Sequence, residues 1–467
     1  MDLKDYIVSI DLGCSKVVAA LGKLDANGEV VVADLVSKPM EGFIRGEISN
    51  IEQVTTALKA AINELESRNN IIVNEVMVSA SGKHIVCDNT SGFVYVGSDG
   101  EILEENVKQL YENMHNVQAP DGKVILSRIP QNFKIDSREI TTTPVGMYGK
   151  KLEATFGFVL AGKAVLERIG KAFDRVGIKE RKFVAAASAS AEVVATDDEK
   201  EVGVAVIDLG AGTTNLAIYH DKVLRYVASI PMGQDAINKD IKAAAIPERS
   251  IEKLKTSFGY ATASVIPFDR LNSAIRINRR SQHEKDKDIP YRDLCTIINA
   301  RMLDIVEFII DELRASGYQN SLGAGIILTG GGSQLMGVDT LLKERTGQDV
   351  RLGYAEVGVS ANSVEGCSNP ALATAIGLLR VGMEGEQLRV MTPKADIGKQ
   401  QKVVDDEEKA DGGDNDKEQE ESKEQGKKRG GKKKEPKSGS GKKWFGNFIK
   451  RIDEAIFGQE IVGDEDI

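Results

Sequence analysis

Cysteine and histidine are scarce in this sequence, with four of each among 467 residues. The cysteines, Cys14, Cys87, Cys295 and Cys367, stand far apart and show none of the paired spacings of zinc sites or disulfide frameworks. We therefore expect neither kind of site. The scarcity of cysteine fits a reducing cytoplasm.

Long apolar runs are also missing. No uninterrupted stretch approaches the ~18 residues needed to span a bilayer. The N-terminus lacks a basic stretch followed by an apolar segment and a cleavage site, so any membrane contact is expected to be peripheral. The formal net charge of -10 argues weakly against a general nucleic-acid binder, and no nucleic acid is expected as a partner.

The composition is that of a globular protein, with 41% hydrophobic and 28% charged residues. A chain of 467 residues is too long for one ordinary core, so at least two lobes are expected. Strand patterns alternate with helical ones along most of the chain, which predicts an α/β fold. One of the predicted helices is alanine-rich and runs from Phe183 to Ala195.

Two glycine-containing turns each join a pair of apolar strands. Tyr6 to Asp11 and Lys16 to Gly22 read as the first pair, and Val204 to Asp208 and Thr214 to Tyr219 as the second. The repetition suggests two halves of a duplicated architecture that face a common cleft. Either turn alone could equally be an ordinary hairpin that needs glycine.

Backbone N–H groups of such turns can converge on phosphate oxygens, because glycine lets the chain approach closely. A carboxylate in each turn can hold hydrated Mg2+, and a lysine can neutralise phosphate charge. The candidate residues are Asp11, Gly13, Cys14, Ser15, Lys16, Asp208, Gly210, Ala211, Gly212, Thr213, Thr214 and Asn215, with Asp11 and Asp208 as the carboxylates.

A third glycine loop, Gly330, Gly331, Gly332 and Ser333, stands between a predicted strand and a predicted helix. Its bare backbone could lie flat against a nucleobase or ribose. The three loops in this order resemble the phosphate and adenosine motifs of the actin, sugar-kinase and heat-shock chaperone superfamily. That resemblance implies an actin-like fold of two lobes around a cleft that binds ATP and Mg2+.

Several short stretches make the resemblance more specific, namely His84-Ile85, Ile129-Pro130-Gln131, Pro144-Val145-Gly146-Met147, Lys151-Leu152-Glu153-Ala154 and Ile207 through Tyr219. With these stretches the chain resembles the FtsA family of bacterial cell-division proteins, from about Tyr6 to Leu379 and again at the C-terminus. That resemblance implies filament formation by the protein itself, binding to the tubulin-like FtsZ and to other divisome proteins, and a place at the inner membrane of the division septum.

These patterns divide the chain into lobes, an insert and a tail. The insert is recognised by a change to short strands around one helix, and the family implies that it contacts neighbouring protomers or division partners. The predicted parts are residues 1–81 and 164–197 (first lobe, 1A), 82–163 (inserted subdomain, 1C), 198–228 and 318–384 (second lobe, 2A), 229–317 (subdomain 2B), 385–441 (disordered charged linker) and 442–458 (amphipathic helix).

The same resemblance assigns further roles. Glu252 and Lys255 match a helix that faces the adenosine, although they could equally form a solvent-exposed i,i+3 ion pair. Cys14, Ala211 and Asn215 depart from the family's usual threonine, glycine and aspartate. Ser190 falls where active relatives carry a glutamine or glutamate that positions water, so we expect slow ATP hydrolysis at most.

The C-terminal segment 442–458 carries apolar residues at helical spacing, with basic residues at its entry and flank. Such a stripe could pack back on the core, but a long charged linker and the family resemblance favour binding to an anionic membrane surface. The basic block Lys427 to Lys443 could add lipid affinity or serve only as a solubilising tether. The membrane-binding candidates are Lys442, Lys443, Trp444, Phe445, Phe448, Ile449, Lys450, Arg451, Ile452, Ile456 and Phe457.

Two other functions stay open at this point. A small-molecule or sugar kinase would share the three loops, but it needs a carboxylate base, and Phe183 to Ala195 contains no aspartate. A pilus-assembly or shape-determining actin homologue would share the lobes and much of the cleft.

Overall fold

The structure is a computed structural model that describes residues 6–141, 143–277, 287–384 and 391–393. Residues 1–404 form one compact unit, which contains all the described residues. The predicted helix at 442–458 and most of the predicted linker lie outside the described residues. None of the described helices is both long and apolar enough to cross a membrane.

The first five-stranded sheet is built around the first predicted hairpin. Its strands are β1 (Ile7–Leu12), β2 (Lys16–Leu24), β3 (Val30–Pro39), β7 (Glu75–Ala80) and β12 (Glu180–Ala185), in the order β12-β7-β1-β2-β3. The neighbours β1, β2 and β3 are antiparallel, whereas β1, β7 and β12 are parallel.

The second sheet repeats this topology. Its strands are β13 (Val204–Leu209), β14 (Thr214–His220), β15 (Val223–Ile230), β18 (Ile326–Thr329) and β19 (Val350–Leu352), in the order β15-β14-β13-β18-β19. Again three antiparallel strands continue into a parallel pair. The predicted duplication and the actin-like fold of two mixed sheets are confirmed.

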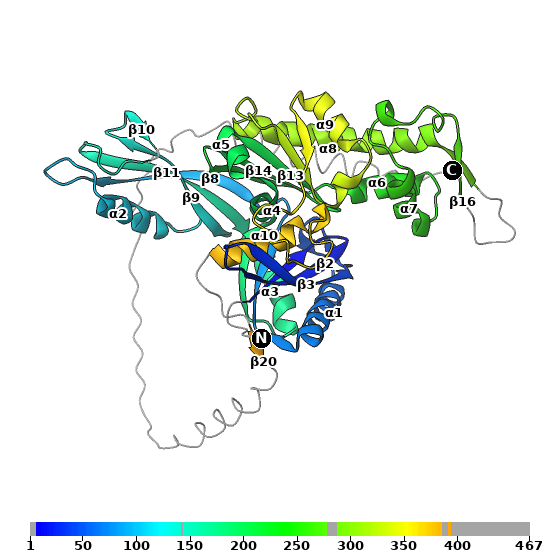
Figure 1. The fold of residues 1–467 in the computed structure, drawn as a ribbon, viewed down its shortest axis with the longest axis horizontal. Helices are drawn as coiled ribbons and strands as arrows, with labels where there is room; N and C mark the ends of the chain where they lie inside the picture. Colours follow the sequence, from blue (N-terminus) through cyan, green and yellow to red (C-terminus); the bar gives the residue numbers. More distant parts are fainter. Residues whose placement is uncertain (1–5, 142, 278–286, 385–390, 394–467) are drawn as a thin grey trace, which may run out of the picture. The chain divides into compact units, whose positions relative to one another are not determined.

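Two small-residue helices pack between the sheets, α4 (Ala186–Val194) and α10 (Ala373–Glu384) (Figure 1). They approach so closely that a Cβ at Gly377 would lie 1.8 Å from the Ala189 carbonyl oxygen. The predicted helix from Phe183 to Ala195 therefore begins too early, because residues 180–185 pair with β7 as β12. A short apolar run beside alanines does not by itself distinguish strand from helix.

Helix α1 (Ile51–Asn69) covers the first sheet and shows how local sequence fixes an element. The Asn50 side chain accepts hydrogen bonds from the backbone N–H groups of Glu52 and Gln53, and Asn70 ends the helix in a left-handed conformation. Its buried residues are Val54, Ala57, Leu58, Ala61, Ile62 and Leu65.

The insert has a sheet and a core of its own. The sheet has the order β10-β9-β11-β8 and is packed by α2; the elements are β8 (Val86–Tyr95), α2 (Glu104–His115), β9 (Lys123–Ile135), β10 (Glu139–Thr141) and β11 (Lys151–Gly162). Large buried side chains of this core include Phe156, Leu110 and Leu152. The insert also contacts β15 of the second lobe.

The remaining described elements connect these parts. They are β4 (Phe43–Ile44), β5 (Glu47–Ile48), β6 (Ile71–Val73), α3 (Lys163–Arg175), α5 (Asp197–Val202), α6 (Gln234–Ala243), α7 (Glu248–Phe258), η2 (Ala263–Val265), β16 (Ala274–Ile277), β17 (Lys287–Pro290), α8 (Tyr291–Ser316), η3 (Gly331–Gln334), α9 (Val338–Thr346), η4 (Pro370–Leu372) and β20 (Met391–Pro393). The strand β20 lies within residues 385–441, which the sequence predicted to be a linker without structure. It pairs with β6 of the first lobe.

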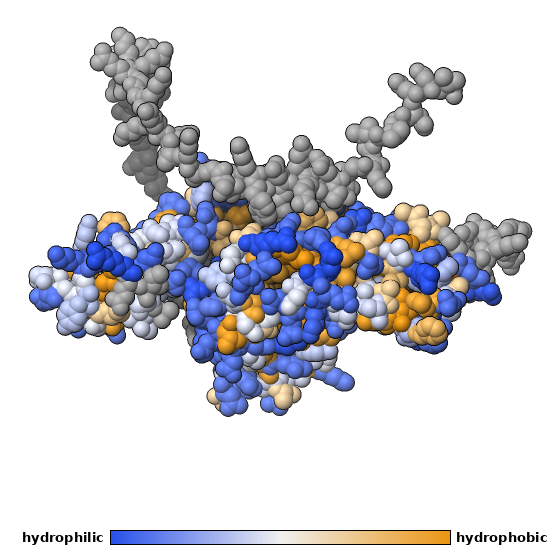
Figure 2. Space-filling view, turned by 90° about the horizontal axis from the view of Figure 1, so that it is seen from above, coloured by the Kyte–Doolittle hydropathy of each residue, from blue (hydrophilic) through white to orange (hydrophobic). Residues whose placement is uncertain are grey.

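Hydrophilic residues cover much of the face seen from above, and the apolar residues on it form separate patches (Figure 2). Among the most exposed aromatic side chains are Tyr95 and Tyr148 of the insert and Phe268 near β16. Most of the apolar side chains through which the helices pack on the sheets are buried.

Candidate nucleotide-binding cavity

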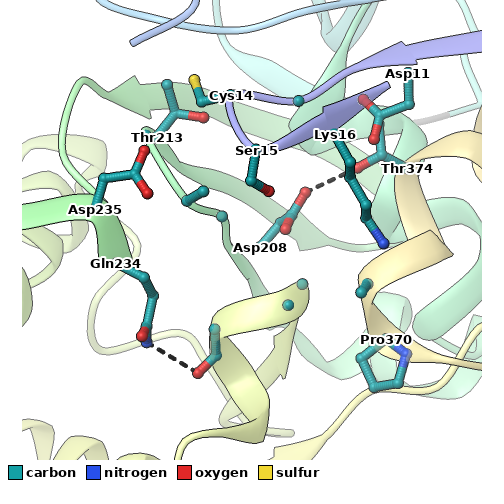
Figure 3. A pocket seen from close by; sticks show the side chains of 18 of the residues that line it. Asp11, Cys14, Ser15, Lys16, Asp208, Thr213, Gln234, Asp235, Pro370 and Thr374 are labelled. Carbon is teal, nitrogen blue, oxygen red and sulfur yellow. Dashed lines mark hydrogen bonds between the residues drawn. The ribbon is translucent and has the colours of Figure 1, made fainter. Parts of the chain in front are cut away.

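A cavity of about 770 Å³ is lined by both duplicated halves of the fold. The turns after β1 and β13, the loop after β18 and the start of α6 supply most of its wall (Figure 3). Its size is that of a site for a small organic ligand. All the predicted nucleotide-binding residues line it except Thr214 and Ser333.

The turn between β1 and β2 is closed by a hydrogen bond from the Gly13 N–H to the Lys16 carbonyl oxygen, at 3.1 Å. A Cβ at Gly13 would lie 2.6 Å from that oxygen, so the turn requires glycine there. The Lys16 side chain extends along the cavity (Figure 3) and forms no hydrogen bond or ion pair among the described residues.

The turn between β13 and β14 has the same construction. The Gly210 N–H donates to the Thr213 carbonyl oxygen at 2.9 Å. A Cβ at Gly212 would lie 2.4 Å from the Cys14 Sγ, so the two turns touch at their tips. The duplicated hairpins therefore meet at the cavity, as the sequence predicted.

Backbone N–H groups at these tips have no partner within the described residues. They belong to Cys14 and Ser15 in the first turn and to Ala211 and Gly212 in the second. Unpaired N–H groups on the wall of a cavity form a concave binding site for an anion, such as a chain of phosphates.

In the triple glycine after β18, Gly330 and Gly332 each leave no room for a side chain, and the neighbouring atoms differ between the two. Gly330 has a φ of 84°, and a Cβ there would lie 2.2 Å from the Asp208 Oδ1. A Cβ at Gly332 would lie 2.6 Å from the Leu209 side chain. Gly331 has only one neighbouring carbon at ordinary contact distance, so its backbone faces open space.

The start of α6 forms a fourth part of the wall, which the sequence analysis missed. The N–H groups of Gln234 and Asp235 donate to the carbonyl oxygens of Gly210 and Ala211, at 3.1 and 2.8 Å, and so hold the second turn. The Gln234 amide also donates to the Gly332 carbonyl oxygen at 3.2 Å (Figure 3). A glycine between a strand and a helix, as at Gly233, was the available signal.

Charges of opposite sign lie along the wall that the hairpin turns form. Burial raises the pKa of Asp208 to about 6, although the Thr374 hydroxyl donates to its carboxylate at 2.8 Å. Burial also raises the pKa of Asp11 and lowers the pKa of Lys16. The two carboxylates thus lack enough positive charge nearby, and a cation would stabilise their ionised forms.

This donor set fits a hydrated magnesium ion. The described residues contain no cluster of three or more histidine, cysteine or acidic side chains that could hold a metal directly. Asp11 and Asp208 line the same cavity and each raises the energy of the other's charge. Magnesium usually keeps several waters and uses one or two carboxylates with substrate phosphates, which is what this pair could supply.

Glu252 and Lys255 on α7 both line the cavity and also form the i,i+3 ion pair, with Nζ and Oε2 3.0 Å apart. The two interpretations of this pair are thus compatible. Lys255 is buried, whereas Glu252 is largely exposed and accepts a further hydrogen bond from Asn238 at 3.0 Å.

Three predicted residues lie outside the cavity lining. The Thr214 hydroxyl donates to the Met232 carbonyl oxygen and the Ser333 hydroxyl to that of Gly330, so both brace the scaffold. Ser190 is fully buried in α4, where its hydroxyl donates to the Ala187 carbonyl oxygen. The residue of α4 that lines the cavity is Ala186, whose side chain has no polar atom.

Sequence comparisons place two matches along the chain. The profile described as "Cell division protein FtsA" matches residues 205–377, and that of the "SHS2 domain inserted in FTSA" matches residues 82–160. The cell division protein FtsA of Pseudomonas aeruginosa is 30% identical over 381 residues, which cover 81% of this chain and 89% of the relative. That of Escherichia coli K12 is 29% identical over 389 residues, covering 82% and 91%.

A comparison of folds finds a similar arrangement in a solved pilus protein. The "PilM-PilN type IV pilus biogenesis complex" aligns with a TM-score of 0.55 and 16% identity, covering 81% of this chain and 99% of that chain. At this identity the likeness concerns the fold alone.

Proposed function

Because this chain belongs to the FtsA family of cell division proteins, we propose that it binds ATP between its two lobes and anchors FtsZ filaments to the membrane. In this proposal it polymerises into actin-like filaments on the cytoplasmic face of the inner membrane and recruits other divisome proteins to the septum. The single observation that supports the nucleotide is the set of unpaired N–H groups from both hairpin tips in one cavity.

Different groups of described residues would bind different parts of a nucleoside triphosphate. In this arrangement the two hairpin tips and Lys16 face the phosphates, and the open backbone at Gly331 and the Glu252–Lys255 pair face the nucleoside. Asp11 and Asp208 would hold Mg2+ through its waters, and the ion would neutralise phosphate charge. Each lobe contributes to the same ligand, so binding would favour the closed arrangement of the lobes.

Hydrolysis is proposed to be slow. Attack on a phosphate needs a side chain that orients or deprotonates water, and α4 offers only Ala186 at the cavity. The nearby Glu192 carboxylate is held by the Lys200 ammonium at 2.6 Å and the Tyr219 hydroxyl at 2.5 Å, and it does not line the cavity. ATP would therefore act mainly as a structural ligand.

Membrane attachment is assigned to the C-terminal segment 442–458. Its apolar residues recur at helical spacing and include the chain's one tryptophan, Trp444, a residue suited to the headgroup region. The basic residues before it would add roughly 1 kcal/mol each near an anionic surface. The sugar-kinase, pilus and shape-determining alternatives are set aside because the family is a cell-division one.

Co-sedimentation with anionic liposomes tests the adaptor role. The full chain with ATP should carry FtsZ filaments into the lipid pellet, and Trp444→Glu should abolish this while ATP-dependent thermal stabilisation persists. Trp444→Phe, which keeps an apolar ring, is the matched control. Equal lipid binding by the Trp444→Glu variant, or FtsZ left in the supernatant by the unmodified chain, would refute the adaptor role.

A further inference from the structure

We propose that the insert is coupled to the nucleotide cavity by a hydrogen-bonded relay through Asn215 and Ser229, so that ATP binding fixes the insert relative to both lobes. The inference rests on the proposed ATP site and adds a conformational output to it. Asn215 and Ser229 act as positioning residues in this scheme.

The relay runs from the second hairpin to the first residue of the insert. Asn215 of β14 lies opposite Ser229 of β15 in the sheet register, and it lines the cavity. The Ser229 hydroxyl donates to the Asn215 Oδ1 at 2.6 Å and accepts the Gly82 N–H at 2.7 Å. Two short bonds therefore join a cavity residue to the point where the chain enters the insert.

The amide of Asn215 is suited to this position because it can donate and accept at once. Its Oδ1 accepts from Ser229, and Asn215 lies opposite Asp208 in the strand register, where its neutral amide lowers the pKa of that carboxyl. An aspartate could accept from Ser229 but would place a second negative charge beside Asp208. Asparagine at this position therefore accepts the Ser229 hydrogen bond without adding a negative charge beside Asp208.

Two glycines with positive φ form the joint at which the relay ends. Gly46 has a φ of 82° and Gly82 a φ of 108°. A Cβ at Gly46 would lie 2.0 Å from the Ser81 carbonyl oxygen, and one at Gly82 would lie 2.5 Å from that of Arg45. The joint is therefore closely packed and cannot shift without moving the turn at Arg45 and Gly46.

That turn also touches the hairpin tips. A Cβ at Gly212 would lie 3.2 Å from the Arg45 backbone nitrogen as well as 2.4 Å from the Cys14 Sγ. The insert's entry point is thus packed against the phosphate turns of both lobes, in addition to the relay.

A second set of contacts holds the insert to the same strand, β15. The Arg225 guanidinium is buried and donates to the Gln131 carbonyl oxygen at 2.8 Å and to the Asn132 side chain at 3.1 Å. The Gln131 amide donates to the Leu224 carbonyl oxygen at 2.9 Å. The insert is covalently part of the first lobe but hydrogen-bonded to the second, so relative motion of the lobes must move it or break these bonds.

Amide hydrogen exchange of the full chain, with and without Mg-ATP, tests the coupling. In the unmodified protein we expect ATP to slow exchange at the hairpin tips and, by about five-fold or more, in the entry segment 82–95; one net hydrogen bond accounts for a factor of this size. Ser229→Ala should remove the effect of ATP at 82–95 but keep it at 208–215. Ser229 does not line the cavity, so ATP binding itself should survive.

Ser91→Ala is the matched control, because it removes an exposed hydroxyl of the insert that faces Thr155 and has no link to the cavity. It should leave the response to ATP unchanged. Two results would overturn the relay but not the ATP site. In the first, ATP slows exchange at 208–215 of the unmodified chain but not at 82–95. In the second, ATP slows exchange at 82–95 equally in the unmodified chain and in Ser229→Ala. No protection at 208–215 in the unmodified chain would instead overturn the proposed ATP site.

Discussion

Gly212 packs directly against Cys14: a Cβ on the glycine would lie 2.4 Å from the thiol sulfur. Gly212 belongs to the hairpin tip of the second lobe and Cys14 to that of the first. Their contact brings the unpaired N–H groups of both tips into one cavity. The tips of the two duplicated hairpins thus meet at Gly212 and Cys14.

Adding one methyl group at this contact should separate the tips. We expect Gly212→Ala to lower the free energy of unfolding by about 1–3 kcal/mol through overpacking, and to weaken ATP binding at least about ten-fold because the N–H groups no longer converge. Urea unfolding measures the first effect and calorimetric titration the second.

Gly97→Ala provides the comparison for that variant. A Cβ at Gly97 has no atom within 4 Å and its φ is not positive, so stability and ATP binding should stay as in the unmodified chain. Equal ATP affinity in both variants would show that the tip contact does not shape the site.

The free energy of unfolding of the ligand-free protein should depend on pH through the Asp208 carboxyl. Its pKa is raised from 3.8 to about 6 by burial, so the native state binds its proton more tightly than the unfolded state does. This group therefore destabilises the fold increasingly as pH rises through the window from about 4 to 6. Relative to Asp208→Asn, the unmodified chain should lose about 1 kcal/mol between pH 5 and pH 7.5.

Denaturant unfolding of both proteins at the two pH values, without nucleotide or metal, gives this difference. If the difference in free energy of unfolding between the two proteins were the same at both pH values, the pKa of Asp208 would not be raised in the folded state. The same substitution should weaken binding of Mg-ATP, because it removes one of the two carboxylates proposed to face the ion's waters.

Two lysines of the cavity wall should distinguish its proposed phosphate end from its proposed nucleoside end. Lys16→Met should weaken ATP binding by about ten- to a hundred-fold but leave adenosine binding unchanged, because a charged hydrogen bond to phosphate is lost. Lys255→Met should weaken ATP and adenosine binding by similar factors. Competition titrations with both ligands measure the split.

Lys239→Met is the control for both lysine variants, since Lys239 is exposed on α6 and does not line the cavity. Loss of adenosine binding in Lys16→Met would reverse the assignment of the two ends.

Supplying a water-orienting side chain at the cavity should accelerate hydrolysis. We expect Ala186→Gln to raise the rate of ATP turnover by about ten-fold, because Ala186 is the α4 residue that lines the cavity. Ser190→Gln should give no gain and should lower stability, since Ser190 is fully buried. Phosphate release at saturating ATP measures both; a gain from Ser190→Gln alone would contradict this assignment.

The local sequence was sufficient to predict the hairpins and the glycine loop. Each depends on neighbouring residues: alternating apolar strands, a turn that requires glycine, and a helix that follows. Gly13, Gly210 and Gly330 are glycines for reasons that a short segment already contains, namely tight turns and a left-handed conformation.

Contacts across the fold could not be predicted in this way. Ser190 was chosen because it resembles the position at which active relatives carry a glutamine or glutamate, whereas the α4 residue that lines the cavity is Ala186, directly after the end of β12. Gln234 and Asp235 are polar residues at an ordinary helix start until the fold places them against the second turn. The Arg225 contact with Gln131 joins residues far apart in the sequence that show no shared pattern.

Both hairpin tips and the glycine loop are proposed to enclose a single ATP, and calorimetric titration of the full chain with Mg-ATP tests this most directly. We expect one ATP bound per chain, and at least about ten-fold weaker binding in Gly330→Val, where a Cβ would lie 2.2 Å from the Asp208 Oδ1. The account would be contradicted if ATP gave neither binding heat nor thermal stabilisation, or if the Gly330→Val variant bound ATP with unchanged affinity.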